Sequence, residues 1–140
     1  MGEARTVMDA MTRAMFDGDM ERAKSMYSTD AIGVAPDGSE FKGGHEIVEF
    51  LSPFFRAFPD AEYQAIAQLE SDKTAIDEGI FTGTHTEPME ALGGETIPPT
   101  NKRISMRSCD VATVEGGKIT EHHFYFDMLS MLEQLGISPS

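Results

Sequence analysis

Residues 118–136, KITEHHFYFDMLSMLEQLG, change from one periodicity to another without a break. Up to Phe126 the segment favours an extended strand, because β-branched and aromatic side chains alternate with polar ones. From Met128 to Leu135 the apolar residues follow helical spacing, and Gly136 is a typical helix stop. The stretch predicts a strand over 118–126 that leads directly into a closing helix over 128–135.

Three further strands are expected before this stretch. They cover residues 61–70, 73–86 and 102–114. The sequence EGG at 115–117 predicts a hairpin between the last two strands of the chain. In the first strand, alternation puts Tyr63, Ala65, Ala67 and Leu69 on one face. Residues 87–101 are rich in Gly and Pro and predict a long loop, of a length that is often functional in a compact domain.

The first half of the chain is predicted to be mainly helical. A one-face apolar stripe that includes Met15 indicates a helix over 3–17, and a short helix from Met20 to Tyr27 follows the N-cap residue Asp19. Asp37-Gly38 predicts a tight hairpin. A third helix is expected before Pro59. Its stripe consists of Ile47, Val48, Leu51, Phe54, Phe55 and Phe58.

Helices followed by a run of strands indicate an α+β fold rather than a βαβ one. With 140 residues, the chain is expected to form a single domain over 1–140. A long antiparallel sheet must bury one face, and the three N-terminal helices carry the apolar stripes that can cover it. We therefore expect a curved antiparallel sheet wrapped round these helices, forming a cone with a central pocket for a ligand.

Composition narrows the classes of partner. The chain has 11 basic and 24 acidic residues and a formal net charge of −13, which repels nucleic acid and anionic lipid. A small neutral ligand or another protein is the more natural partner. No apolar run has transmembrane length, and the N-terminus lacks the zones of a secretory signal. Cys109 is the single cysteine, so no internal disulfide forms and a cytoplasmic location is expected.

The hairpin around EGG places Asp110 opposite a histidine in either possible register. With a three-residue loop the partner is His122, and with a two-residue loop it is His123. Alternation puts His122, Phe124 and Phe126 on one side of the strand, and the two phenylalanines favour this side as the inner one. With the three-residue loop, Met106, Ser108 and Asp110 join the same face.

An Asp–His pair among apolar side chains suits general acid–base catalysis. Loss of hydration makes a carboxylate a stronger base, and the histidine can donate a hydrogen bond to a developing oxyanion. Asp110 and His122 are therefore candidate catalytic residues. The wall residues Met106, Ser108, Phe124 and Phe126 are candidates for substrate contact. The alternative is a structural charge pair at a sheet edge or a dimer interface.

Asp127 has two interpretations. It precedes a helix, where Asp is a favoured N-cap, and alternation turns it away from Phe126. A bulge or the bend between strand and helix would instead swing it into the mouth of the cone as a catalytic base.

His85 shares a strand face with Phe81, Gly83, Gly79 and Ala75. These small inward residues leave room, so His85 is expected to border the pocket, although a lone histidine is more often structural. Phe54 and Met15 belong to core stripes, and some of their atoms are expected on the pocket wall. No metal site is expected, since His122 and His123 point to opposite faces of one strand.

The order and spacing of four segments resemble the SnoaL-like polyketide cyclases of the nuclear-transport-factor-2-like superfamily. The segments are KGGHEIVEFLSPFFRAFPDAEY at 42–63, GTHT at 83–86, GGKITEHHFYFD at 116–127 and LEQLG at 132–136. The resemblance implies a curved-sheet cone with a deep pocket and a dimer through the outer sheet face. It also implies ring closure by intramolecular aldol condensation without metal or cofactor.

In that family an aspartate on the last strand removes a carbon-bound proton, and Asp127 is the only aspartate available there. If the catalytic position corresponds to Phe124 instead, this chain lacks that base. Two functions stay open. One is a cofactor-independent cyclase, or a related aldol enzyme, lyase or isomerase, acting on a small neutral carbonyl compound. The other is a small-molecule-binding domain of the same fold without turnover, with a protein-binding adaptor as a third possibility.

Overall fold

The computed structural model of the protein describes residues 2–90 and 94–137. Its helices are α1 (Glu3–Phe16), α2 (Met20–Ser25), α3 (Gly43–Ala57) and α4 (Met128–Leu135). Its strands are β1 (Tyr27–Val34), β2 (Glu40–Lys42), β3 (Glu62–Ser71), β4 (Thr74–Thr84), β5 (Met89–Glu90), β6 (Thr96–Ile97), β7 (Arg103–Glu115) and β8 (Lys118–Phe126).

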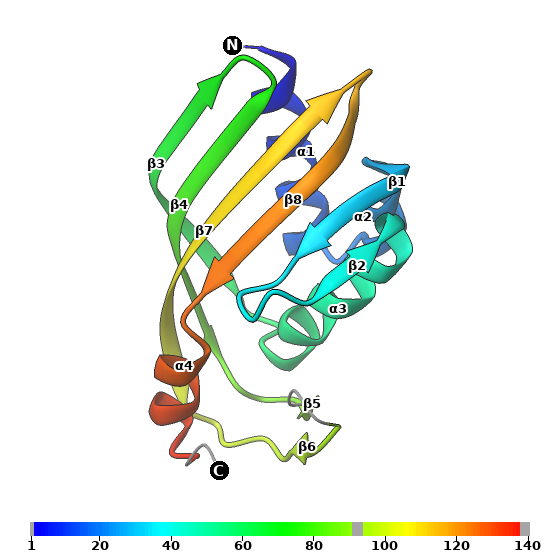
Figure 1. Ribbon diagram of the computed structural model, residues 1–140. Helices are drawn as coiled ribbons and strands as arrows, with labels where there is room; N and C mark the ends of the chain where they lie inside the picture. Colours follow the sequence, from blue (N-terminus) through cyan, green and yellow to red (C-terminus); the bar gives the residue numbers. More distant parts are fainter. Residues whose placement is uncertain (1, 91–93, 138–140) are drawn as a thin grey trace.

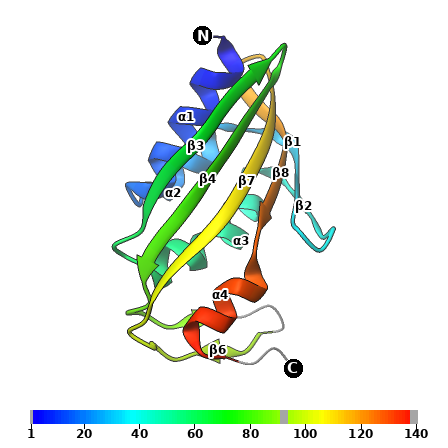
Figure 2. The same cartoon turned by 90° about the vertical axis from the view of Figure 1, so that its left-hand side faces the viewer.

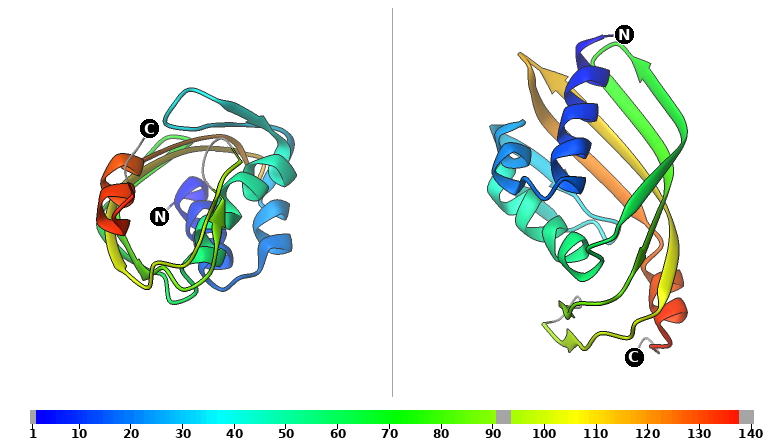
Figure 3. Two further views of the ribbon diagram at one scale, coloured as in Figure 1. Left: turned by 90° about the horizontal axis from the view of Figure 1, so that it is seen from below. Right: turned by 180° about the vertical axis from the view of Figure 1, so that it is seen from behind.

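Six strands form one sheet in the order β2-β1-β8-β7-β4-β3, and β5 and β6 form a separate small ribbon (Figure 1). The large sheet bends strongly and partly encloses α1 and α3, as Figure 3 shows from below and from behind. Seen from the sheet side, the helices α1 to α3 lie behind the strands, and α4 lies at the lower end of β7 and β8 (Figure 2). This arrangement is the predicted cone, an α+β fold in which helices cover one face of a curved sheet.

One pair of strands departs from the antiparallel pattern. β1 pairs with β8 in parallel, with Gly33 opposite His122 and Val34 opposite His123. Its start at Tyr27 also corrects the predicted helix over 20–27, because α2 ends at Ser25 and Tyr27 is already in the strand. Tyr27 is 5% exposed and packs in the core. A short helix is easily overridden when its last residue can bury an aromatic ring in a sheet.

Two β-bulges change which residues face the helices. In β8, Thr113 pairs with Glu121 and Val114 with Ile119, so Thr120 is an extra residue. In β3, Ala65 pairs with Gly79 and Ala67 with Glu78, so Ile66 is extra. The prediction that Tyr63, Ala65, Ala67 and Leu69 share one face is therefore wrong. The first two pair with Phe81 and Gly79 on the inner face, while Leu69 is 59% exposed.

The core has two parts along the cone. Met8, Ile47, Val48 and Phe124 lie in the part nearer the N-terminus. Phe58, Ile104 and Met131 lie in the part that α4 closes. Within residues 2–90 and 94–137, no helix is long and apolar enough to cross a membrane.

Candidate active site

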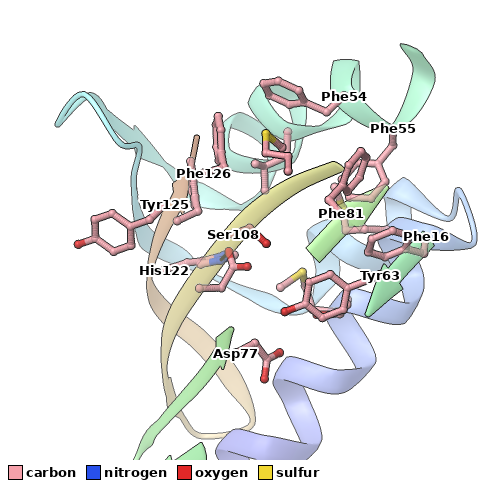
Figure 4. A pocket seen from close by; sticks show the side chains of 17 residues that line it. Phe16, Phe54, Phe55, Tyr63, Asp77, Phe81, Ser108, His122, Tyr125 and Phe126 are labelled. Atoms are coloured by element: carbon pink, nitrogen blue, oxygen red, sulfur yellow. Dashed lines mark hydrogen bonds and ion pairs between the residues drawn. The ribbon is translucent and has the colours of Figure 1, made fainter. Parts of the chain in front are cut away.

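A cavity of about 100 Å³ lies between the sheet and the helices α1 and α3. Its wall is mainly aromatic and thioether side chains. They are Phe16, Phe54, Phe55, Phe81, Phe124, Phe126, Met11, Met15 and Met106. A smaller polar group lies on the sheet side and consists of Tyr63, Asp77, Ser108, Asp110 and His122 (Figure 4). An apolar chamber with a few converging polar groups is the usual form of a small-molecule site.

Asp110 and His122 form the hydrogen-bonded pair that the sequence predicted, but in neither of the two predicted registers. The turn is the two-residue Gly116-Gly117, with both glycines at positive φ. That turn alone would have paired Asp110 with His123, and the bulge at Thr120 shifts the register by one residue. Asp110 consequently lies opposite Phe124, and His122 reaches it diagonally, with Nε2 2.8 Å from Oδ1.

A third residue fixes the orientation of the imidazole. The Tyr27 hydroxyl lies 2.8 Å from His122 Nδ1, and His122 is 1% exposed. Burial, with Asp110 as a further cause, raises the pKa of Tyr27, so its hydroxyl stays protonated and donates to Nδ1. With Nδ1 accepting from Tyr27, the ring N–H is the one on Nε2, and it donates to Asp110. Both ring nitrogens are thus occupied. The side chains of His122 and Asp110 both line the cavity, and Asp110, whose side chain is 28% exposed, is the more accessible of the two.

A second carboxylate lies beside the first. Asp77 on β4 is directly opposite Asp110 on β7 and is 3% exposed. Its Oδ1 is 2.6 Å from Nη2 of Arg5, a helix α1 residue that also contacts Asp9 and the carbonyl oxygen of Leu69. Burial raises the pKa of Asp77, the Arg5 guanidinium opposes this, and Asp110 adds to the rise. The two carboxylates therefore have separate partners, Asp77 a cation and Asp110 a histidine.

Most predicted wall residues do meet in this cavity. Met15, Phe54, Met106, Ser108, Phe124 and Phe126 all line it, together with Asp110 and His122. They come from α1, α3, β7 and β8, so alternation in the strands and helical spacing were enough to place them.

Asp127 is not among the residues that line this cavity. It is the N-cap of α4, and its Oδ1 accepts a hydrogen bond from the Ser130 N–H at 3.0 Å. Its location is the one given by the capping interpretation, at the point where β8 ends and on the side of the sheet away from Phe124.

His85 is buried but also lies apart from the cavity lining. Its Nδ1 contacts the Thr100 hydroxyl at 3.0 Å, and its main chain bonds to Asn101 and Lys102. The room expected at the inward glycines is filled: a Cβ at Gly83 would meet Phe58, and one at Gly79 would overlap the ring of Tyr63. His85 thus fastens the loop after β4 to the start of β7.

Sequence reasoning missed four polar residues of this region. Tyr63 was placed on a strand face but not in the site, Tyr27 was assigned to a helix, and Arg5 was not distinguished among the polar residues of α1. Asp77 carried an available signal, because it alternates with Ala75 and Gly79 on the inner face. Within the described parts of the chain, no three His, Cys, Asp or Glu side chains come together as metal ligands would.

A sequence profile of the SnoaL-like polyketide cyclases matches residues 5–135. No curated protein matches the chain significantly. Among solved structures, AclR from Streptomyces galilaeus, described as a candidate hydroxylase, superposes with a TM-score of 0.81 at 21% identity, over 100% of this chain and 89% of that one. IdmH from Streptomyces antibioticus, described as a candidate polyketide cyclase, gives 0.79 at 21% identity, over 97% and 100%. A SnoaL-like protein from a Jannaschia species gives 0.78 at 16% identity, over 96% and 94%. At these identities the structural likeness concerns the fold alone.

Proposed function

Because the chain belongs to the SnoaL-like polyketide cyclase family, we propose that it is a cofactor-independent enzyme acting on a small neutral carbonyl compound of polyketide type. The reaction is an intramolecular aldol condensation or a related proton-transfer reaction, such as an isomerisation. The observation that carries the proposal is the Asp110 carboxylate, which faces an aromatic cavity and is held by His122 at 2.8 Å.

Asp110 takes the part that the family gives to an aspartate on the last strand. In this chain the last strand carries Phe124 at the inward position, and Asp110 is its direct partner on β7. A carboxylate from the neighbouring strand therefore reaches the same part of the cavity. His122 and Tyr27 act through Asp110 as positioning residues, because neither ring nitrogen of His122 is free to contact a substrate.

The proposed reaction needs only proton transfers and one new carbon–carbon bond. Asp110 removes a proton from the carbon next to a carbonyl group, and the electron pair moves onto the carbonyl oxygen to give an enolate. The enolate carbon attacks a second carbonyl carbon of the same molecule and closes the ring. The second oxygen becomes an alkoxide and takes the proton back from the Asp110 carboxyl, so no group is lost or gained.

The cavities suggest how a substrate would fit. The inner cavity of about 100 Å³ accommodates the reacting end. A second cavity of about 280 Å³ lies between α3, the β5–β6 ribbon and α4. Phe54 lines both, so the remainder of a larger substrate would extend past its ring. Two carboxylates on the inner wall disfavour an anionic ligand, in agreement with the net charge of −13.

A homodimer through the outer face of the sheet belongs to the same proposal. On that face Leu69, Ile76 and Val111 lie in one row across β3, β4 and β7. Leu69 is 59% exposed and Ile66 is 48% exposed. An exposed apolar patch on a sheet face suits a two-fold interface.

The test compares one substitution at two aspartates. Asp110→Asn keeps the side-chain shape and removes the charge that accepts a proton, so turnover of a candidate polyketide ester should fall by about 10²–10⁴-fold. Asp127→Asn is the matched control, since Asn also caps a helix well and this residue lies outside the cavity lining. Both variants should keep the circular dichroism spectrum and the ligand affinity of the parent protein.

The outcomes separate the alternatives. Activity lost only in Asp127→Asn would move the base to Asp127. Full activity in both variants would refute acid–base catalysis by either aspartate. A protein that binds polyketide-like ligands but turns over none would be the small-molecule-binding domain instead.

A further inference from the structure

Tyr63 presents a hydroxyl group that no other residue uses. The residue lies on the inner face of β3, opposite Phe81, and lines the cavity. Its hydroxyl oxygen is buried and has no hydrogen-bond partner within residues 2–90 and 94–137. A buried hydroxyl without a partner is unfavourable by about 1–3 kcal/mol, so its retention in a ligand cavity calls for an explanation.

The position of this hydroxyl follows from its contact with Gly79. A Cβ atom at Gly79 would overlap Cζ and Oη of Tyr63, so the phenol end lies directly over this glycine. Gly79 pairs with Ser108, and the next inward pair along the same strands is Asp77 with Asp110. The Tyr63 hydroxyl is thus about one inward row, roughly 7 Å along the strands, from the carboxylates. Figure 4 shows it directed toward the side of the cavity where Asp77 and His122 lie.

Besides Tyr63, the described side-chain donors at the cavity are His122 and the hydroxyls of Thr12, Ser108 and Tyr125. Among all these hydroxyls, that of Tyr63 is the one that is buried without a partner among the described residues. Both nitrogens of His122 are occupied by Tyr27 and Asp110. The carboxylate itself is an acceptor while it is ionised. Burial first, and then Asp77 and Asp110, raise the pKa of Tyr63, so its hydroxyl stays protonated. A preorganised neutral donor in an apolar cavity stabilises developing negative charge more than water does.

We propose that Tyr63 is a further catalytic residue, whose hydroxyl donates a hydrogen bond to the carbonyl oxygen of the substrate as it becomes an enolate. The proposal rests on the proposed function, in which Asp110 removes the proton. It also narrows the substrate: the carbonyl oxygen lies toward β3 and β4, and the acidic carbon lies toward β7. When the Asp110 side chain is neutral, ligands that resemble a planar enolate, such as phenolates, should bind in the same place.

Gly79 allows the Tyr63 ring to occupy its position in the cavity. Alanine at this position would place a methyl group where the Tyr63 ring lies. The ring would have to turn out of the cavity, and the donor would move with it. Gly79→Ala should therefore reproduce the loss caused by Tyr63→Phe without touching the hydroxyl group itself.

The experiment measures binding of 4-nitrophenol, whose anion is coloured and mimics an enolate. The starting protein is Asp110→Asn, in which the neutral amide stands in for the carboxyl after it has taken the proton. Adding Tyr63→Phe should weaken phenolate binding by about 10- to 100-fold, as expected for a hydrogen bond to a charged group. Adding Tyr125→Phe is the matched control: this residue contributes to the cavity lining, but its ring is 49% exposed and is directed away from the other lining side chains (Figure 4). This change should alter binding by less than twofold.

Three results would overturn the proposal. One is binding within twofold after Tyr63→Phe, and another is no detectable phenolate binding to Asp110→Asn. The third is a larger loss from Ser108→Ala than from Tyr63→Phe, which would assign the donor to Ser108. Because the measurement involves no turnover, it stays informative if Asp110 proves not to be the base.

Thermal denaturation distinguishes a catalytic role of Tyr63 from a structural one. Tyr63→Phe removes a hydroxyl that has no partner among the described residues and keeps the ring. The variant should be as stable as the parent protein or more stable, while its affinity for 4-nitrophenol falls. A stability loss that accompanies the affinity loss would indicate a structural role.

Discussion

Arg5 supplies the positive charge beside the buried Asp77, and replacing it with methionine isolates that contribution. Methionine keeps much of the length and apolar stem of arginine but carries no charge. The side chain of Asp77 is 4% exposed, and Arg5 is its only ion-pair partner within the described residues. Removing one member of a buried pair usually lowers the free energy of unfolding by about 3–5 kcal/mol.

The loss should depend on pH, because Asp77 can escape the isolated charge by taking up a proton. With an ordinary pKa of 3.8, protonation costs about 1.36 kcal/mol for each pH unit above that value. This limits the penalty to about 4 kcal/mol at pH 7 and about 1.6 kcal/mol at pH 5. The folded-state pKa of Asp77 rises further in the variant, so its stability falls as pH rises above about 4.

Urea unfolding of Arg5→Met at pH 7 and pH 5 measures this difference. Arg103→Met is the matched control, because that ion pair with Asp60 is exposed and spans 3.9 Å, so its loss should be below about 1 kcal/mol at either pH. The double variant Arg5→Met/Asp77→Leu should recover most of the stability, since no isolated charge remains. An equal loss at both pH values, or a double variant no more stable than Arg5→Met, would refute the reasoning.

Four other outcomes are expected. Asp127→Ala should lower unfolding free energy by about 1 kcal/mol in thermal denaturation while Asp127→Asn lowers it less; equal losses would contradict the capping role. Sedimentation should show a dimer at micromolar concentration and a monomer for Leu69→Asp, and a monomeric parent protein would argue against the outer-face interface. Burial lowers the pKa of His85, so stability should be lost as pH falls below 6.5, and His85→Gln should reduce that slope in urea unfolding at pH 5–7.5; an unchanged slope would implicate other groups. Gel shifts at physiological salt should show no DNA or RNA binding, and a salt-sensitive shift would contradict this.

The elements with strong periodicity were predictable from sequence. The closing helix was predicted over 128–135, as observed, and Gly136 ends it in the left-handed conformation. The long strands were predicted to within a few residues, as was the inner face that carries Met106, Ser108 and Phe124. These features follow from local rules, since alternation and helical spacing are properties of neighbouring residues.

The details of the site depended on features that local patterns do not carry. The extra residue Thr120 makes Asp110 the partner of Phe124, and nothing in the alternation of KITEHHFYF marks it. The parallel contact of β1 with β8 brings Tyr27 to His122 across 95 positions of sequence. The pairing of Arg5 with Asp77 likewise depends on how α1 crosses the sheet. Long-range contacts of this kind are set by packing.

The bent sheet also places the residues proposed for chemistry and the residues that would select a substrate in different parts of the fold. Asp77, Asp110 and His122 stand in the middle of long strands, where main-chain ladders on both sides fix their spacing. The second cavity is lined by α3 on one side and by the β5–β6 ribbon and α4 on the other. The ribbon and α4 lie at one end of the large sheet (Figure 1). Insertions or exchanges there can alter which molecule is admitted without disturbing the residues proposed for proton transfer. On such a scaffold, related proteins can differ in the substrates they admit while they keep the same residues proposed for proton transfer.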